Sequence, residues 1–132
     1  MLLYPSRTEN YVNPTLVDCR VKLLDNISGD NEAIINSGNN VKLQFIFELS
    51  PTQRQSNVLP KIVFTKNNGQ QTEFQLNNNE YNTDTLTGIK TVEIDMLSIK
   101  TVQLIQQYEA ISGTVPAGFD LLYLLDILLL PI

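Results

Sequence analysis

Val41-Lys-Leu-Gln-Phe-Ile-Phe-Glu-Leu49 is the stretch that decides the fold class of this chain. Every second residue from Val41 to Leu49 is large and apolar, and mainly polar residues, Lys42, Gln44 and Glu48, stand between them. Successive side chains of a β-strand point to opposite faces, so this alternation predicts a strand with one buried face. An α-helix would scatter the same apolar residues around its circumference.

Several other segments have the alternation or the β-branched composition of strands, and turn residues separate them. They are residues 15–25, 32–35, 61–66, 71–76, 89–96 and 99–105. Asn68-Gly69 tolerates positive φ angles and predicts a hairpin with a tight primed turn between 61–66 and 71–76. For 99–105 a helix over 98–109 is the competing prediction, because its apolar residues also fit a 3.6-residue period; we favour the strand.

The end of the chain, Phe119-Asp-Leu-Leu-Tyr-Leu-Leu-Asp-Ile-Leu-Leu-Leu-Pro-Ile132, is its most apolar segment. It is too short to span a bilayer as a helix, which takes about 20 apolar residues. We therefore predict a buried strand in the middle of a sheet that the N-terminal region shares. Residues 77–88 and 112–118 are predicted to be loops, since they are rich in turn residues.

The sum is an all-β domain over residues 15–132, a single jelly roll or β-sandwich of about eight antiparallel strands. Residues 1–14 are interrupted by Pro5 and Pro14 and are expected to form an extended N-terminal arm. The length of 132 residues suits one domain. Hydrophobic residues make up 42% of the chain, which is enough for a core.

Composition excludes several classes of function. The net charge of −5, with no cluster of Lys or Arg, argues against nucleic acid as a partner. The chain has no histidine and one cysteine, which rules out a Ser-His-Asp triad and a His/Cys zinc site. Cys19 alternates with Val17 and Val21 and is expected in the core. We expect no enzymatic activity, no cofactor and no direct membrane span, and the N-terminus lacks the pattern of a secretory signal.

Carboxylate pairs offer little support for catalysis. Glu93 and Asp95 are two residues apart, as in a glycosidase pair, but the alternation places both on the solvent face of their strand. Calcium is the one ion whose hard oxygen ligands occur together. The alternative sets are Asp25, Asn26, Asp30 and Asn31, or Asn77, Asn79, Glu80 and Asp84, and neither has the spacing of an EF-hand.

Two groups of residues are candidate binding sites. The first is a polar ligand loop, in which Tyr81 is placed to stack on a sugar ring; its residues are Asn77, Asn79, Glu80, Tyr81 and Asp84. The second is a subunit interface that combines aromatic residues of the arm with acids of the last strand. Its residues are Tyr4, Tyr11, Asp120 and Asp126.

The layout of an arm, strands such as Asn40-Val-Lys-Leu-Gln-Phe45 and Lys61-Ile-Val-Phe-Thr-Lys-Asn-Asn-Gly-Gln70, and a closing strand from Val115 to Ile132 resembles a known group of proteins. These are the small single-jelly-roll penton and minor capsid proteins of icosahedral phages whose major capsid protein is a double jelly roll. The resemblance implies a non-enzymatic virion protein, assembled in the host cytoplasm, that forms a homopentamer and contacts the major capsid protein. The alternative is a carbohydrate-binding or receptor-binding β-sandwich module of a phage baseplate, phage tail or polysaccharide-export system.

Overall fold

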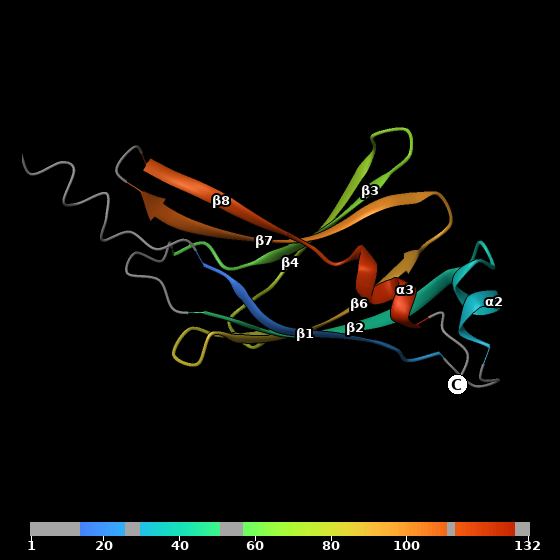
Figure 1. Ribbon diagram of the computed structural model, residues 1–132, viewed down its shortest axis with the longest axis horizontal. Coiled ribbons are helices and arrows are strands. Elements are labelled where there is room, and N and C mark those ends of the chain that lie inside the picture. Colours follow the sequence, from blue (N-terminus) through green and yellow to red (C-terminus); the bar gives the residue numbers. More distant parts are fainter. Residues whose placement is uncertain (1–13, 26–29, 51–56, 111–112, 129–132) are drawn as a thin grey trace, which may run out of the picture.

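The computed structural model describes residues 14–25, 30–50, 57–110 and 113–128. In these residues, eight strands form two four-stranded antiparallel sheets that face each other, with two short helices at their margins (Figure 1). The predicted all-β sandwich of antiparallel strands is therefore confirmed. None of the helices in the described ranges is long and apolar enough to cross a membrane.

In both sheets, strands that follow each other in the sequence pair as antiparallel neighbours. The first sheet has the order β1 (Leu16–Leu23), β2 (Asn40–Leu49), β6 (Thr87–Asp95), β5 (Tyr81–Asn82). The second sheet has the order β4 (Gln71–Gln75), β3 (Lys61–Lys66), β7 (Ile99–Ala110), β8 (Gly113–Asp120). A jelly roll consists of two Greek keys, each of which returns its fourth strand beside its first. The observed order lacks that return, so the connectivity of this sandwich differs from a jelly roll's.

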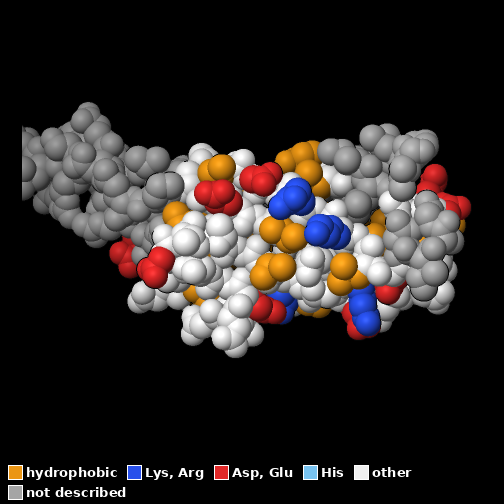
Figure 2. Space-filling view, turned by 90° about the horizontal axis from the view of Figure 1, so that it is seen from below, with side chains coloured by type: hydrophobic (Ala, Val, Ile, Leu, Met, Phe, Trp, Pro, Cys, Tyr) orange, Lys and Arg blue, Asp and Glu red, His pale blue; other side chains and the backbone are white. Residues whose placement is uncertain are grey.

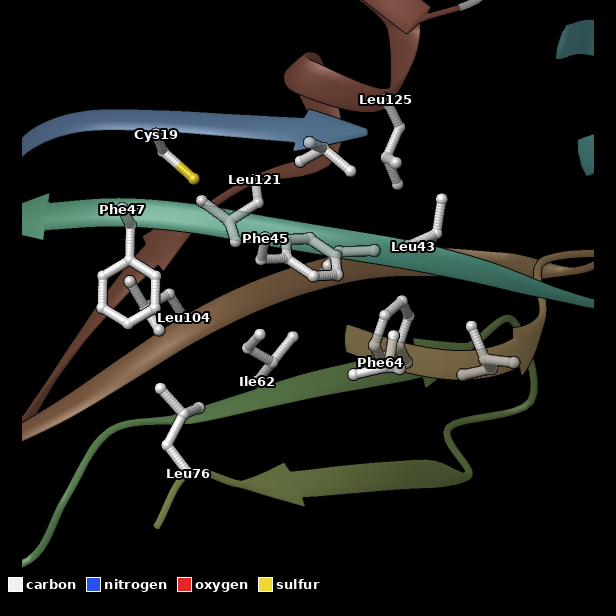
Figure 3. Packing of buried hydrophobic residues seen from close by; sticks show 14 of the residues in the cluster. Cys19, Leu43, Phe45, Phe47, Ile62, Phe64, Leu76, Leu104, Leu121 and Leu125 are labelled. Atoms are coloured by element: carbon white, nitrogen blue, oxygen red, sulfur yellow. The ribbon is translucent and has the colours of Figure 1, made fainter. Parts of the chain in front are cut away.

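The core lies between the sheets and is centred on β2, as its alternation predicts. The side chains of Val41, Leu43, Phe45, Phe47 and Leu49 are all buried. Across the interface, the Phe45 ring meets the Phe64 ring edge to face, with centroids 6.0 Å apart (Figure 3). Each such aromatic pair contributes about 0.5–1.5 kcal/mol beyond the burial of its area. These rings hold the two sheets together.

The last apolar segment is a helix, and the prediction of a buried central strand over 119–132 is wrong. β8 ends at Asp120, and α3 (Leu122–Leu128) follows; residues 129–132 lie outside the described ranges. Leu121 and Leu125, four residues apart, are both buried between β1 and the second sheet (Figure 3). A continuous apolar run does not distinguish a strand from a buried helix, and here the run packs as a helix against β1 and β7.

The predicted loop at 112–118 is also wrong, because residues 113–120 form β8. Pro116 lacks a backbone N–H and is tolerated because β8 is an edge strand of its sheet. β1 is the edge strand of the other sheet, so the two ends of the domain do not share the middle of one sheet. The strand predicted at 99–105 is confirmed over the competing helix, and β7 continues beyond it to Ala110.

The short strand predicted at 32–35 is instead the helix α2 (Asn31–Ile35). Asp30 caps this helix, since its Oδ1 accepts a hydrogen bond of 3.0 Å from the backbone N–H of Ala33. A side-chain oxygen at this position satisfies a backbone donor that a helix leaves free in its first turn. Ile35 then anchors the helix through its buried side chain.

The hairpin of β3 and β4 is confirmed, but its turn is of another type. A type I′ turn needs positive φ angles at both central residues and a type II′ turn needs one at the first, but here Asn68 has none and only Gly69, with a φ of 88°, has one. The N–H of Gly69 donates to the carbonyl of Lys66 at 2.9 Å, and the N–H of Lys66 donates to the carbonyl of Gln70 at 2.8 Å. This is a longer turn with a single left-handed glycine.

β1 carries an irregularity that reverses one predicted position. Its register against β2 shifts between Leu16 and Asp18. Cys19, Val21 and Leu23 face the core as expected, whereas Val17 lies at the shift and is 57% exposed. A bulge of this kind changes which face a residue occupies, and it can be seen only once the partner strand is known.

Candidate functional site

The predicted subunit interface lies partly beyond the described residues. Tyr4 and Tyr11 fall outside them, and Asp126 belongs to α3 without a described side chain. Asp120 is exposed at the end of β8, where its Oδ1 accepts a hydrogen bond of 2.9 Å from the backbone N–H of Leu122. Asp120 therefore helps to start α3, and the expectation that Asp120 and Asp126 share one face of a strand is wrong.

The predicted ligand loop begins with a tight turn that Asn77 organises. The side-chain Oδ1 of Asn77 accepts the N–H of Asn79 at 2.9 Å. Its carbonyl accepts the N–H groups of Glu80 and Tyr81, at 3.0 and 3.1 Å. Asn77 is thus used within the turn, while the side chains of the next two residues, Asn78 and Asn79, are exposed.

Glu80 forms the most enclosed ion pair among the described residues. Its two carboxylate oxygens accept hydrogen bonds from Nζ of Lys90 at 2.8 and 3.1 Å, and Oε1 also accepts the N–H of Asn77 at 3.0 Å. Burial opposes ionisation of Glu80, but the hydrogen bonds from Lys90 and Asn77 and the charge of Lys90 lower its pKa below the ordinary 4.5. Its carboxylate is therefore already paired.

Tyr81 does not serve as a platform for a sugar, and that prediction is wrong. Its side chain is 5% exposed, and its ring stacks on that of Phe47 with centroids 6.1 Å apart. Burial raises the pKa of its hydroxyl. The cause is β5, inside the predicted loop, where Tyr81 pairs with Gly88 and Asn82 pairs with Thr87 of β6. The strand turns Tyr81 toward the core and Asn82 toward the outer face.

A second turn connects β5 to β6. The side-chain Oδ1 of Asn82 accepts the N–H groups of Asp84 and Thr85, at 2.8 and 3.2 Å. The carbonyl of Asn82 accepts the N–H of Leu86 at 2.8 Å, and Leu86 has a φ of 60° with a buried side chain. Asp84 is exposed in this turn.

The two turns border an open depression of about 550 Å³ on the outer face of the first sheet. Figure 2 shows this face, on which acidic, basic and hydrophobic side chains are scattered among other atoms and no single kind of charge gathers. Of the predicted loop residues, Asn79, Glu80 and Tyr81 line the depression, whereas Asn77 and Asp84 do not. The lining also includes residues outside the predicted ligand loop set, namely Ile46, Asn78, Asn82, Thr83, Thr87, Gly88 and Ile89.

One of the missed residues leaves a signal in the sequence. Ile46 is the single apolar residue among the outward positions of β2, which otherwise hold Lys42, Gln44 and Glu48. It pairs with Ile89 of β6, which is 45% exposed. A single apolar residue on a polar face is common on protein surfaces, so Ile46 becomes informative only together with its partner. Its partner Ile89 becomes visible only through the register of the two strands.

Within the described residues the remaining candidates do not assemble into a metal-binding centre, and Asn26 of the predicted calcium set lies outside them. Glu93 and Asp95 lie on the side of β6 opposite the buried Val92 and Ile94, as predicted. Asp25 Oδ2 accepts the N–H of Lys42 at 2.7 Å. In the described part of the chain, no three His, Cys, Asp or Glu side chains lie close enough together to hold a metal ion.

Cys19 is a core residue. Burial, and after it the negative charge of Asp18, raises the pKa of its thiol from 9.0 to about 11. The reactive form of a cysteine is the thiolate, so a thiol with this pKa is inert at neutral pH. Cys19 thus acts as a small hydrophobic side chain between the sheets.

Comparison with protein-family models, with curated proteins and with solved structures finds no match for this chain.

Proposed function

We propose that this chain is a non-enzymatic structural protein that assembles into a closed ring through the edges of its sheets, as a capsid vertex or minor capsid protein of a virion. The virion role rests on the sequence resemblance to penton and minor capsid proteins alone, since the connectivity differs from their jelly roll and the closing strand ends at Asp120. The feature of the structure that supports assembly is the far half of the β7–β8 hairpin.

β7 extends beyond its neighbour β3 in the second sheet. Residues 99–105 pair with β3, whereas 106–110 pair with β8 and with no other strand in the described ranges. This part of the hairpin extends beyond β3 as a two-stranded ribbon (Figure 1). A two-stranded hairpin is marginally stable in water by itself, and its unpaired backbone groups are a template for a strand from another chain.

The inward face of the ribbon is buried within the chain. Gln106 is 4% exposed, and its Nε2 donates to the carbonyl of Gln107 at 2.7 Å. Its Oε1 is buried and has no hydrogen-bond partner among the described residues. A buried acceptor without a donor costs about 1–3 kcal/mol.

Light scattering on the full chain after size exclusion tests the assembly. We expect a closed oligomer, and the resemblance predicts a pentamer. A monomer at the highest soluble concentration would contradict the proposal. Mass spectrometry of purified virus particles tests the virion role separately. If the chain forms an oligomer but is absent from the particles, the assembly proposal stands and the capsid role is rejected.

Thr114→Lys tests whether the ribbon is the contact. Thr114 is exposed on β8 opposite Glu109, so a lysine there gains a cross-strand partner and should leave folding intact. Lysine on an edge strand also disfavours pairing with another chain. Gln103→Lys is the matched control, because Gln103 is flanked by Val63 of β3 and by Asp120 of β8 and a lysine there also gains an acidic cross-strand partner. We expect Thr114→Lys alone to shift the protein toward the monomer, and equal behaviour of the two variants would reject the ribbon as the interface.

A further inference from the structure

We propose that the depression on the outer face of the first sheet is a binding site for a neutral carbohydrate. This inference is independent of the assembly proposed above, since the depression and the β7–β8 ribbon belong to different sheets. It follows from three properties of the site: its floor, its walls and its charge.

The floor of the depression is apolar. Ile46 and Ile89 are directly opposite each other on β2 and β6, and both line the site. The backbone of Gly88 continues this floor without a side chain. Two aliphatic side chains side by side offer a flat hydrocarbon surface, which matches the C–H face of a sugar ring.

The walls are uncharged hydrogen-bonding groups. Asn78 and Asn79 stand on one side, and their side-chain amides form no hydrogen bond with described residues. Asn82 stands with Thr83 on the other side. The Oδ1 of Asn82 is used by two backbone donors, which leaves its NH₂ group for a ligand. Each free amide offers both donors and acceptors, so together they suit the hydroxyl groups of a polyol.

The charge of the site excludes ionic ligands. Glu80 is the one acidic side chain in the lining, and Lys90 neutralises it through two hydrogen bonds. The lining includes no Lys or Arg, so a phosphate or carboxylate would find no counter-ion in it. A cation would have to displace Lys90 from a partly buried pair. The ligand class that remains is neutral, rich in hydroxyl groups and apolar on one face.

The site is also largely preorganised. The turn that carries Asn78 and Asn79 is held by the hydrogen bonds of Asn77, and the other turn is held by those of Asn82. Binding therefore does not have to order these segments, which is a main cost of recognition. A volume of about 550 Å³ is within the range of small-ligand sites.

The proposal is tested by titrating the isotopically labelled full chain with single sugars and following its backbone amide signals by NMR. The neutral probes are glucose, galactose, mannose and N-acetylglucosamine, and the charged probes are galacturonate and sialic acid. We expect saturable shifts at Asn79, Thr87 and Ile89 with at least one neutral probe, and weaker or no shifts with the charged ones. Absence of saturable shifts with every neutral probe would overturn the proposal, as would shifts confined to another surface.

Variants then locate the contacts. Asn78→Ala and Asn79→Ala remove amides that the fold does not use, and each is expected to lower the affinity by up to about tenfold, the value of one hydrogen bond. Asn67→Ala in the β3–β4 turn is the matched control, because Asn67 is also an exposed asparagine of a turn. Equal affinity in all three variants would overturn the assignment of the walls. Light scattering on the same samples shows whether assembly is unaffected, which keeps the two proposals distinguishable.

Discussion

Gly88 has no room for a side chain, because the ring of Phe47 lies against it. A Cβ added at Gly88 would meet three ring carbons of Phe47, Cζ, Cε1 and Cε2, at 2.2, 2.6 and 2.8 Å. An ordinary contact begins at 3.4 Å, so the ring would have to retreat by about 1.2 Å. Phe47 is buried and stacked on Tyr81, which leaves no free space behind it. We expect Gly88→Ala to lower the free energy of unfolding by about 1–3 kcal/mol, the usual cost of overpacking.

The same substitution should behave differently once the ring is gone. Leucine at position 47 lacks the three carbons that clash, and alanine is about 0.5–1 kcal/mol better than glycine inside a strand. In a Phe47→Leu background Gly88→Ala should therefore be neutral or stabilising. Urea denaturation of the four proteins gives the coupling energy, which we expect to be about 2 kcal/mol. A Gly88→Ala variant as stable as the wild type, or one with the same loss in both backgrounds, would refute the reasoning.

Three further predictions concern titration and capping. The raised pKa of Cys19 means that its stabilising effect is complete below pH 9.0 and is lost as pH rises toward about 11, because only the unfolded chain ionises there. Urea denaturation at increasing pH should show this loss of stability, and Cys19→Ala should reduce the dependence of stability on pH in this range. The lowered pKa of Glu80 has the opposite sign, so its contribution is present above pH 4.5 and is lost as pH falls through the lowered value. Glu80→Gln should therefore lower the free energy of unfolding by about 1 kcal/mol at pH 7 and reduce the loss of stability in acid. Glu93→Gln, in an exposed ion pair, should change neither quantity. Asp30→Ala should lower the free energy of unfolding by about 1 kcal/mol, because α2 loses its cap. Asp30→Asn should keep most of the capping stability, since asparagine is also a good cap, and chemical denaturation measures both variants.

The candidate site was only partly predictable from the sequence. The asparagine-rich loop drew attention to Asn79 and Glu80, which do line the depression. The floor was missed, because Ile46 and Ile89 are far apart in the chain and meet only through the pairing of β2 with β6. Tyr81 was assigned to the wrong side, because the two-residue strand β5 is too short to leave a periodic signal.

The sequence by itself determined which segments alternate and therefore that the chain forms an antiparallel sandwich. The alternation of β2 and β6 is a local property, since a strand with one buried face must place apolar residues at every second position. The tertiary structure decided what the apolar C-terminal run becomes. Leu121 and Leu125 would be equally hydrophobic in a strand or a helix, and only their packing against β1 and the second sheet shows that the run is helical. It also decided where the depression forms, since strand register, which no single segment encodes, brings its floor together.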